Sequence, residues 1–203
     1  MRYILLCICL LSLLGCGIDI KTQQDTKPTT TANEQAKTIQ GQDEHVIAAK
    51  QALSSGNYDK AIEESTIAIN VNANNAEAYS IRGFATALNS DIAKGLIDTK
   101  KAYDLDPNNV ANYYNMAMVY KLQGQLNDSK QWFEKVLEKD PSNTWSVYGI
   151  ATIYADQGED TKALDWLEKA IKIDPSVKAV AAEQDHFERF HNNERFKQLV
   201  GSK

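Results

Sequence analysis

Apolar residues recur at helical spacing through most of the chain after residue 42. In the segment 110–143 the first stripe is Tyr113, Met116, Ala117 and Tyr120, and the second is Phe133, Val136 and Leu137. Residues spaced by three and four lie on one face of an α-helix. The pattern therefore predicts two amphipathic helices in this segment, each with one face to bury.

The same arrangement returns every 34 residues. Asp106-Pro107, Asp140-Pro141 and Asp174-Pro175 share this spacing, and a proline cannot continue a helix. The period divides the chain into four units, 42–75, 76–109, 110–143 and 144–177. Three columns hold small residues in eleven of twelve positions: Ala49, Gly83, Ala117 and Ala151; Ala61, Gly95, Ser129 and Ala163; Ala68, Ala102, Val136 and Ala170. Small residues in register indicate helices that cross closely.

A fourth column lies in the middle of each unit and reads Gly56, Ser90, Gly124 and Gly158. Glycine commonly ends a helix, so this column predicts the turn between the two helices of a unit. A single hairpin of this kind cannot bury its apolar face alone. We therefore expect the four units to stack in series.

The 34-residue unit resembles the tetratricopeptide repeat (TPR), and the resemblance covers residues 42–177. It implies an all-α fold, a right-handed α-solenoid of stacked helix-turn-helix hairpins. The first unit departs most from the family pattern, since Ala73 replaces the closing proline. The second carries Arg82 and Thr99 at positions that are usually apolar, so we expect looser packing there.

Residues 178–203 follow the last unit and are expected to form two more helices, at 178–184 and 194–200. Phe187, Phe190 and Phe196 are too apolar for an exposed tail. We predict that these C-terminal capping helices cover the open end of the stack, as repeat arrays require for solubility. The alternative is an arm that binds a partner.

The N-terminus has the features of a targeting signal. A basic start at Arg2 is followed by twelve mostly apolar residues, 3–14, which would span about 18 Å of a hydrocarbon core about 30 Å thick. This run fits the h-region of a secretory signal rather than a membrane span. Leu13-Leu14-Gly15-Cys16 resembles the lipobox of bacterial lipoproteins; the alternative is an ordinary signal with a chance cysteine.

The lipobox resemblance implies a signal peptide at 1–15, removed before Cys16, and a diacylglycerol on the Cys16 thiol. It also implies an exported protein anchored to a membrane by its lipid. In a two-membrane host this would be the outer membrane or the periplasmic face, and in a one-membrane host the outer face of the cell membrane. Residues 16–41 then comprise the lipidated cysteine and a segment without aromatic residues, which we expect to be a flexible tether.

Composition narrows the classes of function. The chain has 22 Lys and Arg against 27 Asp and Glu, a net charge of −5, which argues against nucleic acid as a partner. His186 and His191 are five residues apart, whereas two ligands on one helical face need three or four. No nucleophile elbow, phosphate-binding glycine loop or Cys-x-x-Cys occurs. We therefore expect no enzyme, no metal and no cofactor besides the lipid on Cys16.

The protein is then expected to act by binding a partner on its surface. In the TPR family the first helix of each unit lines a concave groove. By register, the outward residues of these helices are Lys50, Leu53, Phe84, Leu88, Tyr114, Met118, Lys121, Trp145, Tyr148 and Thr152. Aromatic residues and Met are favoured at the centres of interfaces. For Phe84, Tyr114 and Tyr148 the alternative is that they fill space between units.

These residues suggest the class of partner. Some TPR relatives bind terminal carboxylates, but of the corresponding positions here only Asn115 fits, so that mode is not expected. An unidentified protein or an apolar or aromatic peptide is the expected ligand. The expected function is a membrane-anchored scaffold for a partner polypeptide in the cell envelope. The alternative is a lipoprotein that forms a homo-oligomer through the groove or the C-terminal end.

Overall fold

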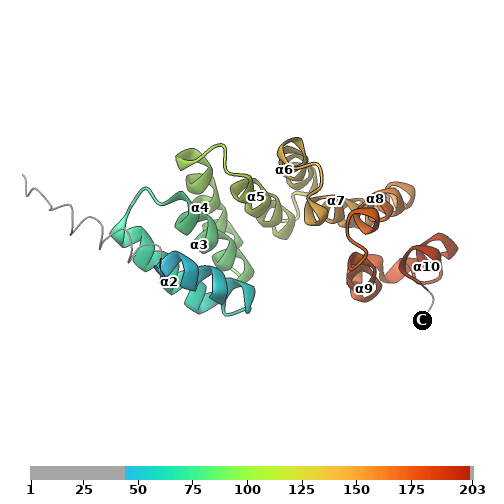
Figure 1. The fold of residues 1–203 in the computed structure, drawn as a ribbon, viewed down its shortest axis with the longest axis horizontal. Coiled ribbons are helices and arrows are strands. Elements are labelled where there is room, and N and C mark those ends of the chain that lie inside the picture. The colour runs from blue at the N-terminus through green and yellow to red at the C-terminus, as the bar shows by residue number, and fades with distance from the viewer. Residues whose placement is uncertain (1–43, 202–203) are drawn as a thin grey trace, which may run out of the picture.

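The computed structural model describes residues 44–201, which form helices and turns without a β-strand in that range. Helices neighbouring in sequence pack against each other and continue in series along a curved α-solenoid (Figure 1). The predicted signal peptide, Cys16 and the tether up to residue 41 lie outside the described residues. No helix within 44–201 is both long and apolar enough to cross a bilayer.

The helices form successive antiparallel pairs. Helical residues 44–54 precede α2 (Tyr58–Val71), and α3 (Ala76–Leu88) precedes α4 (Ile92–Leu105). The next pairs are α5 (Val110–Leu122) with α6 (Leu126–Lys139), and α7 (Thr144–Asp156) with α8 (Asp160–Ile173). The C-terminal segment adds α9 (Val177–Glu183), the 3-10 helix η1 (Asp185–Phe190) and α10 (Glu194–Val200).

Local chemistry sets where these helices begin and end. The residues at the mid-unit turns are all left-handed: Gly56, Ser90, Gly124 and Gly158 have φ between 76° and 80°. Such a φ is easy for glycine and strained for Ser90. Asn75 and Asn143 each cap a following helix, because their side-chain oxygens accept hydrogen bonds from the backbone N–H of Ala78 and Ser146.

The three columns of small residues form the contacts between helices. All twelve are buried in the structure. At the crossing of α3 and α4, a Cβ built on Gly83 would lie 2.7 Å from the Gly95 carbonyl oxygen. The expectation of looser packing in this unit is therefore wrong. Two glycines let the backbones approach, and Arg82 is paired with Asp98 at 2.7 Å.

Replacing Gly83 with Ala should destabilise the protein by about 2 kcal/mol. Overpacking costs about 1–3 kcal/mol, and the atoms that the new methyl group meets include the Thr99 backbone nitrogen at 2.8 Å. The better helix propensity of Ala returns at most about 1 kcal/mol. Urea denaturation of the full chain, followed by circular dichroism, measures the change.

The matched control is Ala93→Gly on the same helix pair. Ala93 is exposed on α4, so its replacement loses only helix propensity, about 1 kcal/mol. If Gly83→Ala leaves the free energy of unfolding unchanged, the close crossing of α3 and α4 does not set the stability of this unit.

The C-terminal segment folds back on the last hairpin. Phe187, Phe190 and Phe196 are 0%, 1% and 2% exposed and share a core cluster with residues of α7 and α8. The 3-10 helix η1, which holds two of these rings, was not expected from the sequence. Its two phenylalanines, Phe187 and Phe190, are both buried. In the described chain these rings are therefore not available as a partner-binding arm.

Candidate functional site

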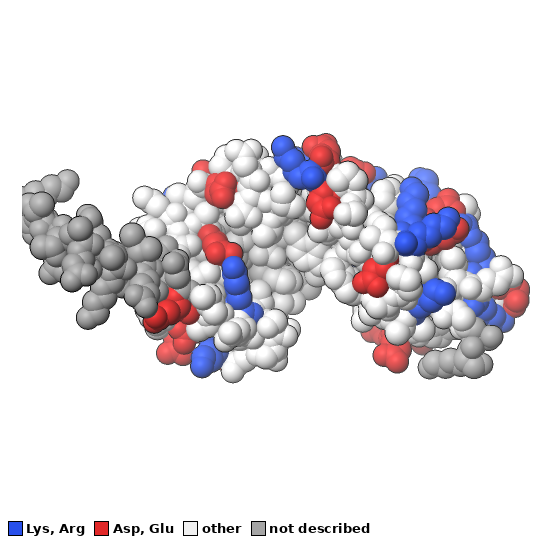
Figure 2. All heavy atoms as spheres, viewed as in Figure 1, with Lys and Arg blue, Asp and Glu red and all other residues white. Residues whose placement is uncertain are grey.

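The inner side of the arc carries the candidate site. Helices α5 and α7 lie on the hollow side of the arc, while α6 lies on the outer side (Figure 1). The surface around the hollow is largely free of Lys, Arg, Asp and Glu in the view of Figure 2. A concave surface with few charged side chains is suited to an apolar partner rather than to a nucleic acid.

Three adjoining cavities lie along α5. We call them together the α5–α7 groove. The first, of about 390 Å³, is lined by residues that include Val110, Tyr114 and Trp145. The second, of about 270 Å³, shares Tyr114 and Trp145 with it. The third, of about 360 Å³, shares Met118, Lys121 and His186 with the second. The shared residues make the three cavities one continuous groove.

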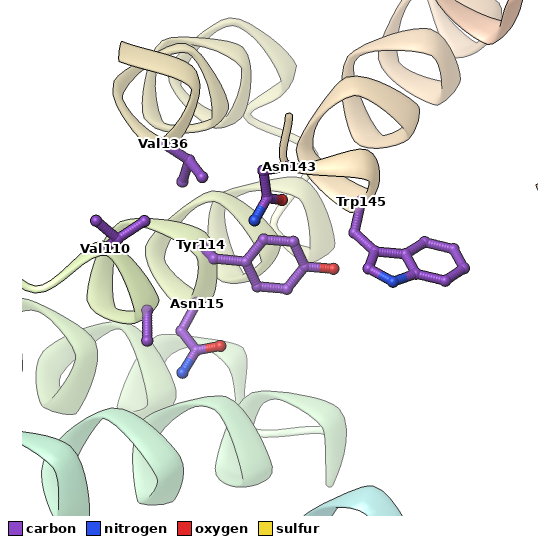
Figure 3. Close-up of a pocket in the computed structure, with 7 residues that line it drawn as sticks. Val110, Tyr114, Asn115, Val136, Asn143 and Trp145 are labelled. Carbon is purple, nitrogen blue, oxygen red and sulfur yellow. The ribbon is translucent and has the colours of Figure 1, made fainter. Parts of the chain in front are cut away.

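Aromatic side chains form the middle of the groove. Tyr114 and Trp145 project from α5 and α7 into the same open space (Figure 3). Tyr114 packs edge-on against Phe133 at 5.7 Å between ring centroids, and Trp145 packs edge-on against Tyr148 at 6.0 Å. Trp145 is 45% exposed although it is a large apolar residue. Such an exposed ring above a rigid aromatic base is typical of an interface residue.

Burial changes the pKa values of two tyrosines in the groove, Tyr114 and Tyr148. Desolvation raises the pKa of Tyr114 and, more strongly, that of Tyr148. The Tyr148 hydroxyl is buried and has no hydrogen-bond partner within residues 44–201. Both phenols are therefore neutral over the physiological range and can only donate or accept hydrogen bonds.

A polar cluster lies at one end of the groove. The Lys121 Nζ donates to Thr152 Oγ1 at 2.5 Å and contacts His186 Nε2 at 3.2 Å, while His186 Nδ1 lies 2.6 Å from Asp156 Oδ1. An ammonium group only donates, so Nε2 accepts and the imidazole proton resides on Nδ1, from which it is donated to Asp156. The cluster thus joins α5, α7 and η1 through four side chains.

The structure brings together six of the predicted groove residues: Tyr114, Met118, Lys121, Trp145, Tyr148 and Thr152. Tyr148 is 8% exposed rather than outward-facing, because Phe187 of the C-terminal segment packs against it at 5.9 Å. It nevertheless forms part of the cavity wall.

The other predicted residues lie outside the three cavities. Lys50 forms a salt bridge with Glu77 at 2.5 Å, and Leu53 packs into the core between the first hairpins. Phe84 and Leu88 are half-buried. These four positions belong to the first two units, which precede the α5–α7 groove in the array.

Sequence reasoning missed the wall that the C-terminal segment contributes. Val180 of α9, Gln184 between α9 and η1, and His186 of η1 line the second cavity. The 34-residue register carries no information on them, because they follow its last unit. In the described part of the chain, no group of three or more His, Cys, Asp or Glu residues could hold a metal ion.

Known proteins share this architecture. Two models of the tetratricopeptide repeat match residues 99–131 and 122–183. Among solved structures, pilF of Pseudomonas aeruginosa is 14% identical with a TM-score of 0.67, over 80% of this chain and 75% of that chain. MamA is 17% identical with a TM-score of 0.58, over 79% and 86%. No curated protein sequence matches significantly.

A third similar structure is also a TPR protein. YrrB, described as a TPR protein with an unusual peptide-binding site, is 16% identical with a TM-score of 0.55, over 84% of this chain and 89% of that chain. At identities below 20% these likenesses concern the fold alone.

Proposed function

Because the chain is a tetratricopeptide-repeat protein, we propose that it is a membrane-anchored scaffold of the cell envelope that holds a partner polypeptide in the α5–α7 groove. The observation that carries the proposal is a continuous aromatic groove with an exposed tryptophan, Trp145, at its centre. TPR proteins bind protein or peptide partners, and the peptide-binding site named for YrrB supports the same use of this fold.

The proposed location rests on the N-terminal sequence. Leu13-Leu14-Gly15-Cys16 supplies the lipobox pattern, and Cys16 would carry the diacylglycerol. Two or more acyl chains anchor a protein stably, whereas a single chain binds only marginally. The segment that follows Cys16 would then act as a spacer between the lipid and the helices.

The proposal includes no catalytic step. TPR proteins are generally non-catalytic scaffolds, and the groove offers aromatic and apolar side chains with one polar cluster. The lining residues include no serine or cysteine, and the Thr152 hydroxyl beside Lys121 donates its proton to the Gly149 carbonyl oxygen rather than to a base. We therefore assign the groove to binding.

Site-specific photo-cross-linking in cells tests the proposal with the full chain. A benzophenone amino acid at position 114 should give an adduct with a partner protein, and the same group at position 97 should not. Ile97 is the matched control, since it is 68% exposed and lies on α4. Equal adducts from both positions would show that the partner does not bind specifically in the groove. An adduct with a second copy of the chain would show self-association instead.

Replacing Trp145 with Ala should weaken partner binding about thirtyfold and reduce the position-114 adduct accordingly. Truncation of a central aromatic residue typically costs about 2 kcal/mol or more of binding energy, and the Trp145 ring is an exposed part of the groove wall. Quantitative immunoblotting of the adduct measures the loss. Ile97→Ala should leave the adduct unchanged; if it reduces the adduct equally, Trp145 has no special role.

A further inference from the structure

The polar cluster at the end of the groove contains a charge that is poorly compensated. Lys121 is half-buried on α5, and burial lowers the pKa of its ammonium group against a smaller, opposite effect of Asp156. The Asp156 carboxylate itself accepts the short bond from His186. Among the residues that line the three cavities, Lys121 is the one Lys or Arg.

The ammonium group also has unused hydrogen-bonding capacity. It carries three N–H donors, and in the described part of the chain two of them meet acceptors, Thr152 Oγ1 and His186 Nε2. The Tyr148 hydroxyl, in the wall of the same cavity, has no partner there either. The middle of the groove is thus aromatic. Toward one end of the groove, Lys121 and Tyr148 have hydrogen-bond donors without acceptors in the described part of the chain.

We infer that the groove takes a partner segment in which a large apolar side chain and an acidic one lie close together in sequence. The apolar side chain packs between Tyr114 and Trp145, and the carboxylate of the Asp or Glu side chain accepts the third hydrogen bond of Lys121. This inference rests on the proposed function, since it names the chemistry of the segment that the groove binds. The charge complementarity at Lys121 selects it over a wholly apolar segment.

The carboxylate belongs to a side chain rather than to a chain terminus. Lys121 lines both the second and the third cavity, and the third continues past it to Leu122. A partner segment can therefore run over Lys121 and onward. The length of α5, thirteen residues, corresponds to about 20 Å, which accommodates about six extended residues.

Binding of defined peptides to the full chain in dodecyl maltoside tests the inference. The probes are acetylated and amidated peptides of Ser and Gly that carry one Phe and, one to four residues before or after it, one Glu. Their counterparts carry Gln instead, and a third set ends in Phe with a free carboxylate. The indole N–H signal of Trp145 in NMR spectra reports binding, while Trp132 and Trp166, which line none of the three cavities, are internal controls.

At one spacing at least, the Glu peptide should bind about tenfold more tightly than its Gln counterpart, as expected for a charge-assisted hydrogen bond. Lys121→Met and Lys121→Gln should both abolish this preference. Lys94→Met should retain it, because Lys94 is exposed on α4. Unchanged Trp132 and Trp166 signals establish that each variant is folded.

Three results would overturn the inference: equal binding of Glu and Gln peptides at every spacing, a Glu preference that survives loss of Lys121, or preference for the free terminal carboxylate. If Glu and Gln peptides bind equally but both shift the Trp145 signal, the inference about the acidic residue is wrong while the proposed binding function is still supported. The absence of any Trp145 shift would count against the aromatic groove itself, so the two failures are distinguishable.

Discussion

Replacing Phe187 with Ala should lower the free energy of unfolding by about 3–5 kcal/mol, the usual cost of removing a buried phenyl ring. Phe187 is 0% exposed and contacts three other rings, those of Tyr148, Phe190 and Phe196, at centroid distances of 5.9, 5.7 and 5.7 Å. Truncation leaves a cavity between η1, α7 and α10 that these rigid rings cannot fill. Thermal unfolding of the full chain by circular dichroism measures the loss.

The effect reaches the groove because Phe187 supports Tyr148 from behind. Without the Phe187 ring, Tyr148 loses the contact that keeps it in the wall of the second cavity. We therefore expect the Phe187→Ala variant to bind groove peptides more weakly even at temperatures where it is folded.

The control for Phe187 is Ile97→Ala. Ile97 is 68% exposed, and surface substitutions usually change stability by less than about 0.5 kcal/mol. Two melting curves that coincide would show that the C-terminal segment unfolds separately from the repeats. In that case the segment could not serve as a cap for the stack.

The periodic part of this fold is predictable because its determinants are local and repeated. The column that contains Ala117 and Ala151 sets the crossing of helices, and the column that contains Gly124 sets the turns. Register along α5 and α7 then places Tyr114 and Trp145 on the inner surface, where the structure has them. Their positions depend only on helix geometry.

Contacts between segments far apart in sequence were not predictable. His186 meets Asp156 and Lys121 across separations of 30 and 65 residues, and no period links these positions. The burial of Tyr148 depends on where η1 folds back, which follows from the packing of three phenylalanines rather than from their spacing. The non-periodic C-terminal segment is therefore both the least predictable part and the part that completes the groove.

The same limit explains the wrong expectation for the second unit. Arg82 occupies a position that is usually apolar in the repeat. From the repeat pattern alone, such a residue indicates poor packing. Its partner Asp98 lies one helix later, on the face that α4 turns toward α3, and the pair forms a two-pronged contact at 2.7 and 2.9 Å. The hydrogen bond with Asp98 is the largest of the effects that raise the pKa of Arg82.

Replacing Arg82 with Met should destabilise the protein by about 3 kcal/mol. The Arg82 and Asp98 side chains are 22% and 11% exposed, so removal of Arg82 leaves a carboxylate largely out of water without its partner. Breaking a buried pair from one side typically costs about 3–5 kcal/mol, and the partial exposure of Arg82 places the expected loss at the lower end. Urea denaturation of the full chain gives the value.

A double variant separates the cost of an unpaired charge from the worth of the pair. Arg82→Met combined with Asp98→Leu removes both charges and keeps the volume apolar, so its stability should return to within about 1 kcal/mol of the original protein. If the double variant is as unstable as Arg82→Met alone, the unpaired charge on Asp98 does not cause the loss of stability. The cause is then the loss of the contacts that the Arg82 guanidinium makes with Thr66 and Tyr79. Since Arg82 lines none of the three groove cavities, peptide binding by these variants should follow the folded fraction alone.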